Sequence, residues 1–177
     1  RALKIEGVKG SWYSQVENWR RWTRVLGLER MWVELRENSK GYRDLMRALL
    51  ELIGEDPGRV DRDDFDGLWE QSFTPIELKS LQERLEERCY DLFAVTWLMQ
   101  ERAAELSPEA VGVNVISMTH CVGDVLWVLW LHRLIQSWRG GGTPFCMPIA
   151  PLFETIDDLH RSAAMLNELY QHPHYRA

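Results

Sequence analysis

Glu154 is the residue of this chain best placed to bind a metal ion. It follows the apolar run Phe145–Phe153, which predicts a strand, and it precedes Thr155, which with Asp158 makes the S/T-x-x-D/E pattern of a helix N-cap. Glu154 is therefore expected at the C-terminal tip of a strand, the edge at which α/β proteins bind ligands. A carboxylate there is a hard oxygen ligand that suits Mg²⁺ or Mn²⁺. In the alternative interpretation, Glu154 is only a negative charge favoured by the dipole of the following helix.

Arg36 is the matching candidate for binding a phosphate. It follows the predicted strand Leu28–Leu35, and its guanidinium offers two parallel donors to a phosphate or carboxylate. With Glu154 it would make half of a site for a phosphorylated, metal-bound substrate. A structural role is the alternative, in which Arg36 only pairs with Glu37 or Glu154.

Three strand–helix units are expected to position these residues. Such alternation is typical of parallel strands joined by right-handed crossovers, which bring all C-terminal strand tips to one edge. Arg36 and Glu154 should then point to the same rim, with the second strand between them. His120, at the tip of the second strand, fits a turn histidine better than a ligand. After a helix at 11–27, the expected units are 28–35 with 42–53, 111–118 with 124–138, and 145–153 with 156–170.

Residues 55–110 are expected to form a helical insertion between the first and second units. Its polar start, 55–67, has the composition of a calcium-binding loop. The register excludes one, because Arg62 and Phe73 fall at ligand positions and neither can bind calcium. A solvated connection or a helix start is therefore expected there.

The second part of this insertion is predicted to be one long helix. Thr74 would cap it, Pro75 would take its first helical position, and Glu77 would complete a capping box. Apolar residues at helical spacing continue the helix to about Leu106, before Ser107-Pro108 breaks it. These apolar residues are Leu78, Leu81, Leu85, Leu92, Val95 and Met99.

Composition narrows the classes of function. The 177 residues carry a net charge of −6 and no long basic run, which argues against a nucleic-acid partner. The longest dense apolar stretch, Val125–Leu131, is far too short to span a bilayer. Three cysteines without a CxxC spacing favour a reduced, cytosolic chain, and the nine tryptophans are expected to fill a core or an interface. Because the sequence starts at Arg1, we expect a piece of a longer protein.

Other catalytic motifs are missing from the sequence. It has no Ser–His–Asp order, no H-E-x-x-H and no G-x-G-x-x-G. Gly140–Gly142 follows a predicted helix, whereas a phosphate loop follows a strand, so these glycines predict a hinge. His172 and His174 alone are a weak metal signal.

Three segments of the chain resemble the phosphoenolpyruvate carboxylase family. The most specific is Phe-Cys-Met-Pro-Ile-Ala-Pro-Leu-Phe-Glu-Thr-Ile-Asp-Asp-Leu at 145–159, which continues to Tyr-Arg at 175–176. Val-Ile-Ser-Met at 115–118, followed by Asp-Val-Leu at 124–126, is similar to a second family segment. Val-Glu-Leu-Arg-Glu-Asn-Ser at 33–39 is similar to the family's Leu-Asp-Ile-Arg-Gln-Glu-Ser strand end.

This resemblance implies a helix-rich α/β fold and a reaction. The chain, as a single partial domain at 1–177, would hold three consecutive βα units of a (β/α)₈ TIM-type barrel, with 55–110 inserted. Bicarbonate would attack the phosphate of phosphoenolpyruvate, and the enolate would be carboxylated to oxaloacetate with release of phosphate. Glu154 aligns with one of two carboxylate ligands of Mg²⁺ or Mn²⁺, and Arg36 aligns with an arginine that binds the substrate phosphate. A cytoplasmic homo-oligomer, a tetramer in the family, is implied as well.

The resemblance also implies that essential groups lie outside this chain. The second metal carboxylate, a glycine-rich arginine loop and a catalytic lysine would follow Ala177, and a catalytic histidine would precede Arg1. The segment alone is therefore expected to be inactive, and no catalytic residue is assigned within it.

Five positions depart from the family pattern. Glu34, Glu37 and Asn38 replace the family's Asp, Gln and Glu around Arg36, and Tyr42 replaces a usual histidine. Gly123 replaces the serine before Asp124, which should deprive that helix of its cap. These positions indicate a divergent member.

Two other functions stay open on the sequence alone. The first is a non-catalytic homologue that acts as a binding or assembly module, suggested by the tryptophan-rich helix at 125–138 and by the substitutions around Arg36. The second is a stand-alone, metal-dependent phosphate-ester enzyme. It would need a second metal carboxylate beside Glu154, from Glu34 or Glu37.

Overall fold

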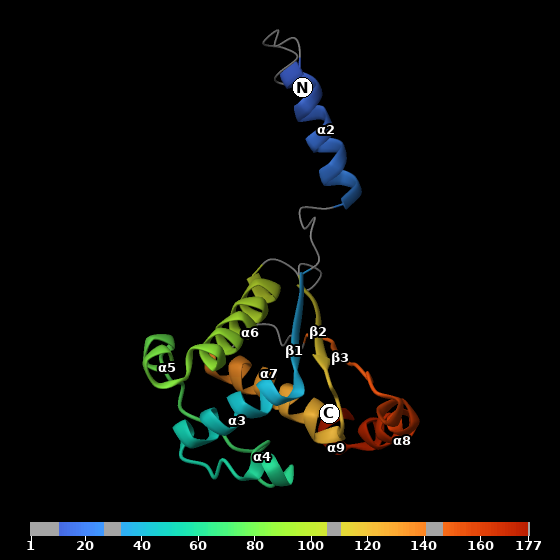
Figure 1. The fold of residues 1–177 in the computed structure, drawn as a ribbon. Helices are drawn as coiled ribbons and strands as arrows, with labels where there is room; N and C mark the ends of the chain where they lie inside the picture. Colours follow the sequence, from blue (N-terminus) through green and yellow to red (C-terminus); the bar gives the residue numbers. More distant parts are fainter. Residues whose placement is uncertain (1–10, 27–32, 106–110, 141–146, 177) are drawn as a thin grey trace. The chain divides into compact units, whose positions relative to one another are not determined.

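The chain divides into two compact units, Arg1–Trp32 and Val33–Ala177. A computed structural model describes residues 11–26, 33–105, 111–140 and 147–176. In the first unit, helix α2 spans Ser11–Leu26, which confirms the helix predicted at 11–27 (Figure 1). Its predicted stop, Gly27, lies outside the described residues.

The second unit contains an open sheet of three parallel strands, covered by helices (Figure 1). Strand β1 is Val33–Asn38, β2 is Val111–Ser117 and β3 is Ile149–Pro151. The order β1-β2-β3 places the second strand between the other two, as predicted. The described residues thus form a helix-rich α/β unit.

The two outer strands differ from their predicted bounds. Strand β1 continues to Asn38 in register with β2, so Arg36 lies inside the strand and not beyond its end. Residues 28–32, predicted as its start, lie outside the described residues. Of the predicted strand Phe145–Phe153, residues 145–146 lie outside the described residues. Within 147–153, strand β3 covers only Ile149–Pro151, because Pro148 and Pro151 have no N–H to give to a ladder.

A helix follows each strand, directly after β1 and after four residues in the other two cases. Helix α3 is Ser39–Ile53, and it starts before the predicted Tyr42 because the Asn38 side chain accepts from the Gly41 N–H and caps it. It ends at Gly54, whose φ of 85° is left-handed, as the sequence predicts. The later helices are α7 at Val122–Trp138, α8 at Ile156–Gln171 and α9 at Pro173–Arg176.

The long helix predicted between Thr74 and Leu106 is wrong in two respects. Thr74 and Pro75 are not helical, and α5, Leu78–Arg84, begins after Glu77, which makes no side-chain cap. The helix is then interrupted at Leu85, whose backbone is extended and whose side chain is buried in the core. Helix α6 starts at Glu87 and runs to Glu105. A short helix, α4 at Arg59–Arg62, lies within the polar connection 55–67.

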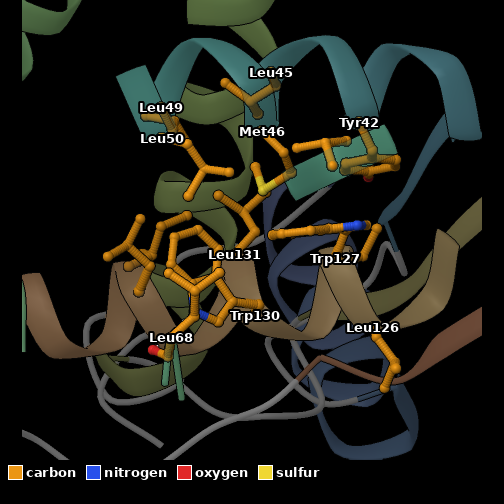
Figure 2. Packing of buried hydrophobic residues seen from close by; sticks show 14 of the residues in the cluster. Tyr42, Leu45, Met46, Leu49, Leu50, Leu68, Leu126, Trp127, Trp130 and Leu131 are labelled. Atoms are coloured by element: carbon orange, nitrogen blue, oxygen red, sulfur yellow. Dashed lines mark hydrogen bonds between the residues drawn. The ribbon is translucent and has the colours of Figure 1, made fainter. Parts of the chain in front are cut away.

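The core lies between α3, α7 and one face of the sheet. Figure 2 shows side chains of α3 pointing toward those of α7, and Ile116 of β2 belongs to the same cluster. Thirteen residues of α7 are buried, which confirms that this helix is covered on nearly all sides. Burial of a large apolar side chain stabilises a fold by about 1.5–3 kcal/mol, so the contact between α3 and α7 contributes strongly to stability. None of the described helices combines the length and hydropathy needed to cross a bilayer.

Three indoles of α7 hold the irregular segment between α4 and α5. Trp127 donates to the Asp63 carboxylate at 3.0 Å. Trp130 donates to the Leu68 carbonyl at 3.3 Å, and Trp138 donates to the Phe73 carbonyl at 3.1 Å. These tryptophans fill the core, as predicted, and they also satisfy oxygen atoms of a segment without regular structure.

Candidate functional site

The C-terminal ends of the three strands are joined by hydrogen bonds. The Ser39 hydroxyl, just after β1, donates to the Met118 carbonyl at 2.7 Å. The Met118 N–H, just after β2, donates to Oε2 of Glu154 at 3.1 Å. Since Glu154 follows β3, these two bonds bring all three strand ends to one edge of the sheet. Arg36 and Glu154 accordingly lie toward the same end of the sheet.

Glu154 is held immediately before helix α8. The Thr155 hydroxyl accepts from the Asp158 N–H at 3.0 Å, and the Asp158 carboxylate accepts from the Thr155 N–H at 3.4 Å. This reciprocal pair confirms the capping box predicted from the sequence. Glu154 itself is exposed, so its carboxylate is accessible at the strand tip.

Arg36 points to the sheet face opposite the helices. It is in register with Val115, whereas its neighbour Glu37 is in register with Ile116, which faces α3 and α7. Successive side chains of a strand alternate between faces, so Arg36 leaves the sheet on the other side. Its side chain is 63 % exposed and forms a long ion pair, 3.7 Å, with Glu34. Exposed pairs of this kind contribute about 0–1 kcal/mol, so a phosphate could displace it.

Glu37 has a separate, structural role. On the helix-covered face it accepts from Arg88 of α6 at 3.0 Å and from the Asn38 N–H at 2.7 Å. The predicted alternative in which Arg36 pairs with Glu37 is therefore not what the structure shows. The same contacts argue against Glu37 as a second metal carboxylate.

His120 is a turn histidine whose backbone N–H and ring Nδ1 both have polar partners. Its Nδ1 lies 3.0 Å from Oδ1 of Asp158, and its N–H donates to Oδ2 of Asp124 at 2.8 Å. The hydrogen bonds from Thr155 and His120 lower the pKa of Asp158 to about 2. His120 thereby ties the turn after β2 to the start of α8.

The sequence analysis missed a half-buried charge cluster centred on Arg43 of α3. Arg43 Nε donates to Asp124 at 2.7 Å, Nη2 pairs with Asp63 at 2.9 Å, and Nη1 donates to the Val60 carbonyl at 2.6 Å. The Asp124 side chain is only 3 % exposed, so Arg43 supplies the opposite charge that compensates for burial of this carboxylate. The partners are up to 81 residues apart, and no local pattern of the sequence links them.

Asp124 also organises the start of α7. Its Oδ2 accepts from the N–H groups of His120 and Cys121, and Cys121 is the N-cap in a capping box with Asp124. The helix therefore starts at Val122, before the predicted Asp124. Burial, with the charges of Asp124 and Asp63, raises the pKa of the Cys121 thiol to about 11, so the cap stays a neutral thiol.

A hollow of about 530 Å³ opens beside the strand ends. Asn38, Ser39 and Met118 form its strand-end side, and the basic residues Lys40 and Arg43 lie on another side. The hollow is large enough for a small ligand, but Lys40 and Arg43 are paired there with Asp44 and Asp124, which also line it. Its lining includes Ser39 and Met118, which are hydrogen-bonded to each other, and Met118 also donates to Glu154.

The fit of a divalent metal to this edge is partial. Glu154 supplies one accessible oxygen donor of the kind that Mg²⁺ and Mn²⁺ prefer. Across residues 11–26, 33–105, 111–140 and 147–176, no three His, Cys, Asp or Glu side chains are grouped so that they could hold a metal. A stand-alone metal enzyme therefore finds no support in the part of the chain that the structure describes.

Comparison with known proteins identifies the family. The family model for phosphoenolpyruvate carboxylase matches residues 1–177. The chain belongs to the phosphoenolpyruvate carboxylase family. The phosphoenolpyruvate carboxylase of Thermus sp. is 31 % identical over 159 residues, 86 % of this chain, and that of Mycobacterium avium is 31 % identical over 167 residues, 87 % of this chain. That of Aliivibrio salmonicida is 47 % identical over 73 residues, 41 % of this chain.

The chain corresponds to a small part of these carboxylases. It spans 17 % of the length of the first two and 8 % of the third. Membership of the family therefore concerns this region, and the activity of the whole carboxylase is a separate question.

Tyr42, which departs from the carboxylase pattern, lies in the core. Its hydroxyl donates to Oδ1 of Asn114 at 2.6 Å, and Nδ2 of Asn114 lies 3.1 Å from Nε2 of His132. Burial raises the pKa of Tyr42, so the hydroxyl remains a donor. Tyr42 is thus part of a buried polar chain across α3, β2 and α7.

Gly123 also differs from the family pattern at a position within a helix, but it does not leave α7 without a cap. The cap is Cys121, and the prediction that Gly123 deprives this carboxylase helix of its cap is wrong. A Cβ at position 123 would overlap the carboxylate of Asp63. The glycine makes room for Asp63, which binds Arg43 and Trp127.

Proposed function

We propose that this chain acts as a segment of a phosphoenolpyruvate carboxylase, in which Arg36 binds the substrate phosphate and Glu154 binds Mg²⁺ or Mn²⁺. The observation that carries the proposal is the junction of the three strand ends through Ser39, Met118 and Glu154, within a chain that matches the family along its whole length. The second metal carboxylate and the catalytic groups would come from outside residues 1–177. The segment alone would be inactive.

The reaction proposed for the complete enzyme is the carboxylation of phosphoenolpyruvate by bicarbonate. A bicarbonate oxygen attacks the phosphorus, and the P–O bond to the enolate breaks, which gives the enolate and a carboxyphosphate. The C–O bond of the carboxyphosphate then breaks to release phosphate and CO₂, and the enolate carbon bonds to this CO₂ to give oxaloacetate. The bound metal would supply positive charge near the enolate oxygen. Arg36 would hold the phosphoryl oxygens through its planar donors and neutralise their charge as the phosphoryl group moves.

The open sheet suits a segment of a closed barrel. We propose that 1–177 is a single partial domain within a (β/α)₈ barrel and that 55–110 is an insertion between two of its units. In such a barrel, the face that carries Arg36 would be the inside, because the helices cover the other face. The homotetrameric state and the cytoplasmic location of this carboxylase are proposed from the family resemblance.

The test replaces Glu154 in the complete carboxylase that carries this segment. Glu154→Gln keeps the shape of the side chain and removes its charge, so we expect weak Mn²⁺ binding and loss of the metal dependence of carboxylation. Asp157→Asn, at another exposed carboxylate of the same region, is the matched control and should leave both unchanged. Unchanged Mn²⁺ affinity in Glu154→Gln would remove Glu154 from this role.

The alternative function is a non-catalytic homologue that acts as a binding or assembly module. Failure of the complete wild-type chain to carboxylate phosphoenolpyruvate, with Mn²⁺ and bicarbonate present, would favour this alternative. In that case, the first variants to test for a gain of activity would replace Glu34, Glu37 and Asn38 by the Asp, Gln and Glu of the family pattern.

A further inference from the structure

Met118 has an unusual backbone for a residue with a side chain. Its φ is 53°, in the left-handed region that non-glycine residues seldom adopt. Its side chain is 40 % exposed, so packing does not account for this conformation. Strained backbone of this kind persists where the surroundings hold it in place, and such residues are frequent at functional sites.

Both polar backbone groups of Met118 are used by the neighbouring strand ends. The N–H donates to Glu154 at 3.1 Å, and the carbonyl accepts from the Ser39 hydroxyl at 2.7 Å. Ser39 is itself buried, 6 % exposed, at the start of α3. A single residue with a left-handed backbone therefore links the residue after β1 to the carboxylate after β3.

The residues after Met118 hold the turn on the other side. The Thr119 N–H donates to the Leu152 carbonyl at 3.2 Å, and the Thr119 hydroxyl donates to the Ile116 carbonyl at 2.9 Å. The His120 N–H is held by Asp124. With both flanks fixed, the direction of the Met118 N–H is set by the fold, before any ligand arrives.

We propose that Ser39 and the left-handed backbone of Met118 are positioning residues that orient the Glu154 carboxylate for metal binding. This inference rests on the proposed function of Glu154. The Met118 N–H holds Oε2, which restricts rotation of the carboxylate and presents its other oxygen at the strand ends. Hydrogen bonds to a ligating carboxylate orient it in this way, and their loss typically weakens metal binding about 10–100-fold.

The experiment measures Mn²⁺ affinity directly, by electron paramagnetic resonance, in the complete carboxylase that carries this segment. Ser39→Ala removes the donor to Met118 with little change in volume, and we expect the Kd for Mn²⁺ to rise on the order of 10-fold. Ser137→Ala is the matched control, because the Ser137 hydroxyl also donates to a carbonyl, at 2.8 Å within α7, away from the strand ends. Ser137→Ala should leave the Kd for Mn²⁺ unchanged.

A second pair of variants tests the conformation of Met118. Met118→Val disfavours the left-handed backbone, because a β-branched side chain clashes there, and it should also raise the Kd. Met118→Gly keeps the N–H, the carbonyl and the positive φ, so its Kd should stay much closer to wild type than that of Met118→Val. If Mn²⁺ binding is weakened equally in Met118→Val and Met118→Gly, the side chain of Met118 and not its backbone conformation affects the metal site. That result would overturn the inference.

The outcomes separate this inference from the proposed function. A lower thermal midpoint with wild-type Mn²⁺ affinity in Ser39→Ala and Met118→Val would show a merely structural role and overturn the inference, while a loss of affinity in Glu154→Gln would still support the proposed function. If Glu154→Gln keeps wild-type affinity as well, both proposals fail.

Discussion

The carboxylate of Asp63 occupies the space that a side chain at position 123 would need. Gly123→Ser should therefore lower the free energy of unfolding by about 1–3 kcal/mol, the usual effect of overpacking. Asp63→Gly vacates the space and suits the left-handed φ of 48° at position 63. In the double variant the two changes should be less than additive by about 1 kcal/mol, measured by urea denaturation. Strict additivity would show that the two positions do not compete for space.

Arg43 neutralises a carboxylate that is almost wholly buried. Arg43→Met should reduce the free energy of unfolding by about 3–5 kcal/mol, because the buried carboxylate of Asp124 would lose its oppositely charged partner. Arg47→Met is the matched control on the same helix, since Arg47 binds the more exposed Asp44 and Asp61. Its effect should be about 1 kcal/mol or less. Equal effects in thermal or urea unfolding would contradict the assignment of Arg43 as the main ion pair.

Stability should depend on pH through His132. Burial lowers the pKa of His132 from 6.5 to about 4, so between these values the unfolded chain binds a proton that the folded chain does not. The free energy of unfolding should therefore fall as the pH falls from about 6.5 to about 4, by roughly 3 kcal/mol in total. His172, whose pKa is also lowered by burial, acts in the same direction.

The variant His132→Gln separates these two contributions. It removes the titrating ring from the core, so most of the pH dependence between 6.5 and 4 should disappear in urea titrations at each pH. If the free energy of unfolding of His132→Gln varies with pH as steeply as that of the wild type, the pH dependence comes from His172 or from other groups.

Arg36 should affect the binding of phosphoenolpyruvate. Arg36→Gln would remove the proposed charge-assisted hydrogen bond to the substrate phosphate, worth about 2 kcal/mol, so the KM of the complete carboxylase for phosphoenolpyruvate should rise roughly 30-fold. The control is Arg88→Gln, at an exposed arginine that binds Glu37 on the helix-covered face. This variant should leave the KM unchanged, and similar effects of the two changes would point to general electrostatics.

The features that the sequence predicted well depend on residues close together in the chain. Thr155 and Asp158 form their capping box within one helical turn, and Gly54 ends its helix through its own backbone freedom. The parallel order of the strands followed from the alternation of elements, which limits the possible connections.

The features that it missed depend on contacts across the fold. The Thr74-Pro75 pattern has the composition of a helix start, but Phe73 just before it is held by Trp138, and the helix begins later, at Leu78. The positions of Asp63 and Arg43 around Asp124 could not be deduced, because no spacing rule relates residues on three separate elements.

The indoles of Trp127, Trp130 and Trp138 donate to the 63–73 segment at every fifth residue, to the Asp63 carboxylate and to the Leu68 and Phe73 carbonyls. This part of the connection should therefore detach from α7 as a unit, and not fray residue by residue. A protease can cut within 63–73 only after the whole segment has opened. The exchange rate of the slowest-exchanging indole protons and the rate of cleavage should therefore report the same opening.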